Sequence, residues 1–286
     1  MSRSNIIFLW IVITLLTSSA SILTKYCNIS AASIGFWRVF GAAILILPFA
    51  IWISKKENKN KFFTKGTLLA GFFLGAHFTT WCWGIQNTSI ANACLFIGLQ
   101  PLITPFIAHY MIGERLNKWE MLAVVLAVFG TIWLTIFQFN ANRSDLAGIA
   151  VTFLSAILCS TYFVLSRKYR AGLHIFVFST EVFFVAAFVQ AIAAYSIYGS
   201  IQVGDTRSII ALVGLVLLPT IGGHALVMYL LKYAKPQLIS FSVPTQFVFA
   251  TLMAVPLFKE VPQLWFYPGA ALVIAGVILG IAKTEG

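Results

Sequence analysis

The chain has 286 residues, of which 60% are hydrophobic and 9% are charged, and its mean hydropathy is +0.92. Soluble proteins carry about 25% charged residues, so this composition excludes a soluble globular domain and predicts a polytopic protein embedded in the lipid bilayer. The net charge of +11 does not indicate a nucleic-acid partner, because the lysines and arginines stand at the ends of apolar runs and form no continuous basic face.

Ten apolar runs follow one another with short connections. Each run is long enough to cross a hydrocarbon core of about 30 Å as a helix. The predicted spans are residues 6–24, 33–53, 67–86, 89–112, 117–137, 146–166, 174–198, 208–231, 236–258 and 263–282. The predicted fold class is therefore an all-α polytopic membrane protein with ten transmembrane helices. The first run imitates a signal peptide, but it continues to Leu23, and we interpret it as a span.

Lysine and arginine are unevenly divided between the two sides of these spans. With both termini placed in the cytoplasm, the cytoplasmic side holds fourteen of them and the opposite side holds four. Because positively charged loops stay cytoplasmic, the sequence predicts a multi-pass protein of the cytoplasmic (inner) membrane with both termini cytoplasmic. The four cysteines stand singly, without the spacing of a metal or redox site, and neither a metal nor another cofactor is predicted.

The two halves of the chain repeat one pattern. A shift of 146 positions aligns Gln100 with Gln246, Glu114 with Glu260, Trp119 with Trp265, and Gly130 with Gly276. We therefore predict two domains, residues 1–140 and 141–286, each a five-helix repeat. Because five is odd, the second repeat is expected to be inverted in the membrane relative to the first. Inverted repeats give alternating access to a site between the halves.

The segment from His77 to Phe96, HFTTWCWGIQNTSIANACLF, carries a further signal together with the QPLITPF, GERL and WEMLAVVLAVFG segments that follow it. This pattern resembles the EamA-like branch of the drug/metabolite transporter superfamily. The resemblance covers essentially the whole chain and is weaker in the second half, where FKEV replaces GERL. It implies ten helices around a central cavity lined by helices one to four and six to nine, with the fifth and tenth peripheral, and it implies no particular substrate.

Three polar residues are predicted near the middle of the membrane. Gln100, Gln246 and His77 each lie about ten residues into a span, or about 15 Å deep. A polar side chain that faces lipid at this depth is costly, so these residues either line a cavity or form hydrogen bonds between helices. We favour the cavity and predict that the two glutamines face one another across it.

Four more residues are predicted to bind a substrate. Ser18 and Tyr162 belong to polar stripes at equivalent places in the first and sixth spans. The stripes are Thr14, Ser18, Ser21 and Lys25, and Thr152, Ser155, Cys159, Tyr162 and Ser166. Trp81 shares a helix face with His77, and His224 matches His77 in the second repeat after a slip of one residue. Aromatic walls with a few polar groups are typical of pockets for small organic solutes, although small hydroxyl residues also serve close helix packing.

Two ionisable residues, Arg38 and Glu181, stand inside spans and correspond at an offset of 143. Their expected depths differ by about 13 Å, which argues against a salt bridge. We expect Arg38 to snorkel outward, the alternative being contact with an anionic group. Glu181 is too short to snorkel, and we predict that it is a coupling residue that binds a proton or a substrate amine.

Two glycine pairs, Gly71-x-x-x-Gly75 and Gly276-x-x-x-Gly280, predict close contacts between helices. The second pair lies in the last span and is a candidate dimer contact. We therefore expect a monomer or a weak homodimer.

These observations favour a secondary transporter that moves a small organic metabolite by alternating access. The family resemblance suggests an amino acid or a related zwitterion, and S-adenosylmethionine or a nucleoside-like metabolite fits the same lining. An intramembrane enzyme is disfavoured, because no span contains aspartate and no Gly-x-Ser-x-Gly motif occurs. A channel would need a charged ring or a filter motif. No nucleotide-binding motif occurs, so a gradient must supply the driving force, with proton coupling as the hypothesis.

Overall fold

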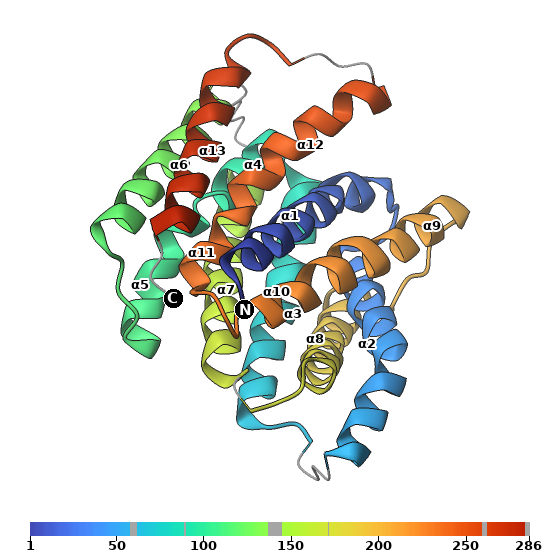
Figure 1. The fold of residues 1–286 in the computed structure, drawn as a ribbon. Coiled ribbons are helices and arrows are strands. Elements are labelled where there is room, and N and C mark those ends of the chain that lie inside the picture. The colour runs from blue at the N-terminus through green and yellow to red at the C-terminus, as the bar shows by residue number, and fades with distance from the viewer. Residues whose placement is uncertain (58–61, 89, 137–144, 171, 259–261, 284–286) are drawn as a thin grey trace.

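The computed structural model describes residues 1–57, 62–88, 90–136, 145–170, 172–258 and 262–283, and these residues form helices without any β-strand (Figure 1). In chain order the helices are α1 (Arg3–Tyr26), α2 (Ala31–Lys56), α3 (Lys65–Asn87), α4 (Ile90–Ile97), α5 (Gln100–Ile112), α6 (Lys118–Ile136), α7 (Asp145–Tyr169), α8 (Ile175–Tyr198), α9 (Thr206–Leu215), the π-helix η1 (Val216–Ala225), α10 (Leu226–Leu230), α11 (Pro236–Ser240), α12 (Ser242–Phe258) and α13 (Phe266–Lys283).

Polar residues at the helix ends explain where several helices begin and stop. The side-chain oxygens of Ser30 and Thr64 accept hydrogen bonds from backbone N–H groups in the first turns of α2 and α3. Asp205 does the same for α9, and the hydrogen bond from the Ser208 backbone N–H lowers the pKa of its carboxyl. Gly113 ends α5 in the left-handed conformation, with φ of 72°. Because these caps lie outside the apolar runs, α2 and α3 extend beyond the predicted spans.

The ten predicted spans correspond to these helices. Within the described residues, nine stretches are long and apolar enough to cross a membrane. The predicted span 236–258 forms two helices instead, α11 and α12, which meet at Phe241. The prediction of an all-α polytopic membrane protein is confirmed. The boundary predicted between residues 140 and 141 lies outside the described residues, as do Lys259 and Glu260.

Three spans depart from a regular α-helix, two of them near their middle and the ninth close to its start. The fourth is interrupted between α4 and α5, just before Gln100 and Pro101. The eighth contains η1, where Pro219 cannot donate a backbone hydrogen bond. The ninth changes from α11 to α12 at Phe241. Irregular backbone at membrane depth is tolerated where it is buried in protein or lines a cavity, so the breaks in the fourth and eighth spans point to the same central region.

The main helix contacts join one half of the chain to the other. Figure 1 shows α6 and α13 side by side at one edge of the bundle, and α2 packs on α8, α3 on α7 and α1 on η1. Numbered as spans, these pairs are five with ten, two with seven, three with six, and one with eight. Exchanging the two halves turns each of these pairs into itself or into another of them, whereas the contact of α3 with α8 is more extensive than its counterpart between α2 and the eighth span.

Glycines allow the closest of these contacts. A Cβ atom on Gly71 would lie 2.8 Å from the backbone oxygen of Val182 in α8, and one on Gly276 would lie 2.7 Å from the backbone oxygen of Ala123 in α6. Both glycine pairs therefore pack within one chain. The candidate dimer contact is corrected, because α6 already covers the Gly276 face of α13.

Candidate functional site

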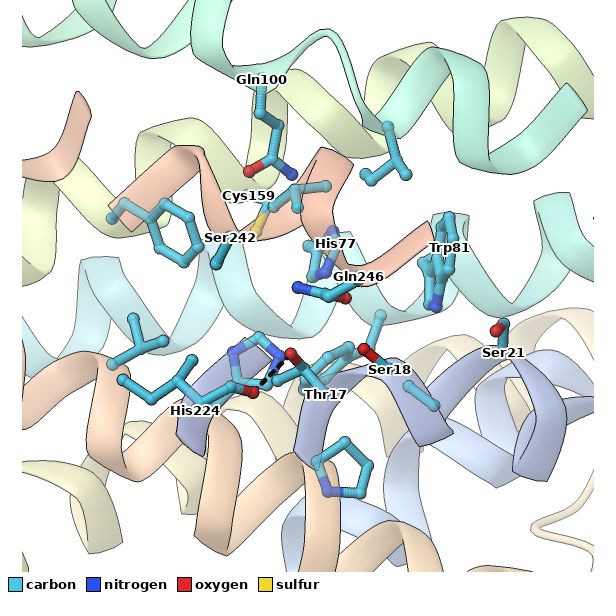
Figure 2. Close-up of a pocket in the computed structure, with 18 of the residues that line it drawn as sticks. Thr17, Ser18, Ser21, His77, Trp81, Gln100, Cys159, His224, Ser242 and Gln246 are labelled. Carbon is cyan, nitrogen blue, oxygen red and sulfur yellow. Dashed lines mark hydrogen bonds between the residues drawn. The ribbon is translucent and has the colours of Figure 1, made fainter. Parts of the chain in front are cut away.

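A cavity lies in the middle of the bundle, between the two halves of the chain. Its walls come from α1, α2, α3, the end of α4 and the start of α5 in the first half, and from α7, η1, α10 and α12 in the second. Its cavity volume is about 70 Å³ in this conformation, and the space between atoms reaches about 770 Å³ only when the solvent at its open end is counted. Most residues predicted from the sequence line it, namely Arg38 and the residues Ser18, His77, Trp81, Gln100, His224 and Gln246 that Figure 2 labels.

The ring of His77 is held by the opposite half of the chain. Its Nδ1 atom lies 3.1 Å from the backbone oxygen of Ser155 in α7 and 2.8 Å from the hydroxyl oxygen of the same residue. That hydroxyl donates to the backbone oxygen of His77 at 3.1 Å. Because a carbonyl oxygen only accepts, Nδ1 carries the ring proton and Nε2 is left as an acceptor. Ser155, predicted as part of a polar stripe, therefore positions a cavity residue.

Four aromatic rings form a cluster along one side of the cavity. The ring centroid of His224 lies 4.9 Å from that of Phe78, 5.9 Å from that of Tyr162 and 6.3 Å from that of His77. Tyr162 is fully buried and does not line the cavity. Its predicted contact with a substrate is corrected, because the ring of Tyr162 packs against His224 and reaches the site only through it.

Gln100 and Gln246 enter the same cavity from the two halves, and in Figure 2 the amide of Gln100 points toward the group formed by His77 and Gln246. Gln100 is 1% exposed, and neither of its amide atoms has a hydrogen-bond partner among the described residues. Leaving a buried polar group unpaired costs about 1–3 kcal/mol. The Cys159 side chain of α7 is a neighbour of this amide, but the interhelical hydrogen bond that was the alternative for Gln100 is not formed with any oxygen or nitrogen of the described residues.

Arg38 does not snorkel to the surface as expected. It is 0% exposed, its Nε donates to the hydroxyl of Thr220 in η1 at 3.1 Å, and its guanidinium carbon lies 3.9 Å from the ring centroid of Phe78. The Thr220 hydroxyl itself donates to the backbone oxygen of Leu215 at 2.7 Å. An acceptor on the π-helix and an aromatic face on α3 thus hold the guanidinium inside the bundle.

Glu181 belongs to α8 and does not line the cavity. Its carboxylate lies beside the start of α3. Its Oε2 accepts hydrogen bonds from the Thr67 hydroxyl at 2.8 Å and from the Phe63 backbone N–H at 3.0 Å. Phe63 has φ of 55°, a conformation that is rare for a bulky residue. Thr67 is ten residues before His77 on α3, about 15 Å along the helix. The position of Glu181 therefore supports a role in holding the α2–α3 connection and gives no direct route to coupling.

We expect Glu181→Gln to leave the pH dependence of transport unchanged and to lower the free energy of unfolding by about 1 kcal/mol, because hydrogen bonds to a charged acceptor become neutral ones. Transport at several pH values and thermal unfolding of the purified protein measure the two effects. Thr67→Val removes one of the same donors and is the matched control. A flattened pH profile in Glu181→Gln alone would restore the coupling role predicted from the sequence.

Several lining residues were missed by the sequence reasoning. Phe78, Phe163 and Phe247 line the cavity, and nothing distinguishes them from the other phenylalanines of apolar spans. Ser242 also lines it, directly after the break between α11 and α12. A polar residue near Pro244 was a usable signal for Ser242, because proline weakens the helix around it.

One end of the bundle is closed by charged contacts between the halves. Arg167 at the end of α7 contacts Glu114 at 3.1 Å and donates to two backbone oxygens after α10, each at 2.9 Å. Lys235 before α11 contacts Glu120 of α6 at 3.0 Å. The lining residues of α1 run in contrast from Ile13 to Ser21, toward the other end of that helix. Glu114 therefore ties helix ends together and does not line the cavity.

The family model of the EamA-like transporter family matches residues 4–136 and again residues 146–281. The chain belongs to the EamA-like transporter family. The resemblance that the sequence motifs suggested is confirmed, and the protein is a membrane transporter of the EamA type. Among the described residues, no group of three histidine, cysteine, aspartate or glutamate side chains is placed to hold a metal ion.

Curated relatives cover most of this EamA-like chain at low identity. An S-adenosylmethionine uptake transporter of Rickettsia prowazekii (strain Madrid E) is 23% identical over 278 residues, which is 94% of this chain and 90% of the relative. Solute carrier family 35 member G1 of Homo sapiens is 22% identical over 269 residues, covering 88% of this chain and 71% of the relative. The names of these relatives give no support to the amino-acid substrate predicted from the sequence.

A solved crystal structure has the same fold, with a TM-score of 0.76 and 18% sequence identity over 99% of this chain and 100% of the other. The arrangement expected of the EamA-like family fits the cavity in most respects. No described residue of α6 or α13, the fifth and tenth spans, lines it. The seventh span, α8, also contributes no lining residue, which differs from the expectation, because α8 packs on the outer sides of α2 and α3.

Proposed function

We propose that this EamA-like protein is a secondary transporter that carries a small organic metabolite by alternating access. The observation that carries the proposal is the central cavity, where polar side chains from both halves of the chain converge beside three interrupted spans. Broken helices at mid-membrane are typical of substrate sites in secondary transporters. The polar groups available for a solute include an unpaired amide on Gln100 and an acceptor nitrogen on His77.

For the substrate we now rank S-adenosylmethionine ahead of a free amino acid. Relatives that span most of the chain carry the name S-adenosylmethionine uptake transporter, whereas the amino-acid hypothesis rested on family analogy and on an aromatic and polar lining that fits both substrates. Phe78, Trp81 and Phe247 supply aromatic surface for an adenine ring. Both substrates contain the same amino-acid end, so the polar groups of the cavity suit either.

The two halves are proposed to act as inverted repeats that exchange conformations. Support comes from the contacts between α1 and η1 and between α3 and α7, which are equivalent when the halves are exchanged. The charged contacts of Arg167 and Lys235 close one end of the bundle. From the lysine and arginine distribution, we place that end and both termini on the cytoplasmic side. Coupling to a proton gradient is proposed only as the source of energy, without an assigned residue.

Counterflow in proteoliposomes tests the proposal. Labelled S-adenosylmethionine and labelled amino acids are offered to vesicles preloaded with the unlabelled solute, and we expect one of them to accumulate. Trp81→Ala should reduce that movement roughly tenfold, since it removes an aromatic wall of the cavity. Trp119→Ala is the matched control, because Trp119 is 51% exposed on the peripheral helix α6. If no solute in a broad metabolite panel moves, the proposed function is wrong.

A further inference from the structure

Arg38 carries a positive charge that no described residue neutralises. Its side chain is 0% exposed, and its Nε is satisfied by Thr220. The two terminal nitrogens, Nη1 and Nη2, have no hydrogen-bond partner among the described residues. A buried charge is strongly unfavourable unless it is paired and hydrogen-bonded, so a guanidinium left half-satisfied in a fixed position requires an explanation.

The residue at the equivalent place in the second half makes the contrast clear. Glu181 is also buried inside a span, and its Oε2 accepts two hydrogen bonds while its Oε1 has no partner among the described residues, but it lies outside the cavity. Arg38 lies on the cavity wall. Both residues thus carry buried polar atoms without a hydrogen-bond partner among the described residues, but only Arg38 stands in the wall of the cavity, where a small shift of the wall would bring its terminal nitrogens into contact with a solute.

The charge of the lining points to the chemistry of the missing partner. Arg38 is the one charged residue among those that line the cavity in the described part of the chain, and none of them is acidic. A guanidinium presents parallel N–H groups that match the two oxygens of a carboxylate. A single positive charge balances a carboxylate, whereas a phosphate monoester carries up to two negative charges and would keep an excess of charge in the cavity.

The fixed position of the guanidinium favours such a planar contact. Phe78 stacks against it at 3.9 Å and Thr220 holds its Nε at 3.1 Å. These contacts occupy one face and one edge of the guanidinium, and the uncharged thiol of Cys82 is a further neighbour that cannot neutralise its charge. Preorganised donors of this kind bind a charged group without a large cost in side-chain entropy.

We infer that Arg38 binds the carboxylate of the transported solute, so that the site selects organic solutes with a free carboxylate over otherwise identical solutes without one. This inference rests on the proposed function and assigns a substrate class to the same cavity. Gln100, whose amide is also unpaired, is placed to bind another polar group of that solute.

The test compares matched solutes that differ only in the carboxylate. We would measure binding by thermal stabilisation, and movement by counterflow, for S-adenosylmethionine against its decarboxylated form, for methionine and phenylalanine against their amines, and for a sugar phosphate. Wild type is expected to bind a carboxylate at least roughly thirtyfold more tightly than its matched amine. Arg38→Met should abolish this preference, and Arg38→Lys should retain part of it.

Stability separates a binding role from a structural one. Removing an uncompensated buried charge should leave the melting temperature of the empty Arg38→Met protein unchanged or raise it. Arg170→Met is the matched control, because Arg170 is a second buried arginine that lies away from the cavity and donates to the backbone oxygen of Leu173. That variant should melt earlier and keep the carboxylate preference.

Three results would overturn the inference. Equal binding of carboxylates and amines, or a carboxylate preference that survives Arg38→Met, excludes the role of Arg38 while leaving the transporter proposal intact. Preferential binding of the sugar phosphate excludes the carboxylate as the recognised group. If no solute of any kind binds or moves in wild type, the proposed function fails and the inference fails with it.

Discussion

Gln100→Leu is expected to reduce transport roughly tenfold to hundredfold without destabilising the protein. Neither amide atom of Gln100 has a hydrogen-bond partner among the described residues, although the side chain is 1% exposed. Leucine has nearly the same length and loses no bond within the empty protein. In the solute-bound protein the amide of Gln100 is expected to form hydrogen bonds with the solute. Its removal loses these hydrogen bonds, which are worth about 1–3 kcal/mol in total. Initial rates of counterflow at several solute concentrations measure the effect.

The chain offers a close control for this substitution. Gln237 in α11 is 2% exposed, and both of its amide atoms also lack a hydrogen-bond partner in the described part of the chain, but it does not line the cavity. Gln237→Leu should therefore match Gln100→Leu in stability and retain transport. Equal transport in the two variants would mean that Gln100 serves only packing. The assignment of the cavity as the substrate site would then lose the support of its unpaired amide.

Gly276→Leu is expected to lower the free energy of unfolding by about 3 kcal/mol. A Cβ atom at Gly276 would lie 2.7 Å from the backbone oxygen of Ala123 and 2.8 Å from the backbone nitrogen of Ala127. These are backbone atoms of α6, so they cannot move aside as the tip of a flexible side chain can. The larger side chain must push α6 and α13 apart along their whole contact. Thermal unfolding in detergent measures the change, and the readout is the loss of the monodisperse peak in size-exclusion chromatography.

Ala275→Leu is the matched control, because Ala275 is exposed on the neighbouring face of the same helix. It adds the same side chain where lipid or detergent surrounds the protein and should change stability little. Since α6 and α13 do not line the cavity, the Gly276→Leu protein that stays folded should bind solute with unchanged affinity. Unchanged stability in Gly276→Leu would show that the two helices are not packed as closely as the structure has them.

The sequence by itself determined the class of protein and the depth of the candidate site in the membrane. Long apolar runs leave no alternative to membrane-spanning helices, because backbone groups in hydrocarbon must be paired within the segment. Gln100, Gln246 and His77 were placed near the middle of the membrane by counting residues, since helix rise converts position into depth. All three line the same cavity. The motif from His77 to Phe96 also predicted the family that the comparison confirmed.

Only the tertiary structure decided which way buried polar residues point. Arg38 and Glu181 look equivalent in the sequence, but a hydroxyl on η1 and the ring of Phe78 draw Arg38 into the cavity, while the α2–α3 connection engages Glu181 elsewhere. In an almost uniformly apolar helix, no periodic pattern reveals which face meets the neighbouring helices. Depth is a property of one helix and can be read from its sequence, whereas the direction of a side chain depends on partners far away in the chain.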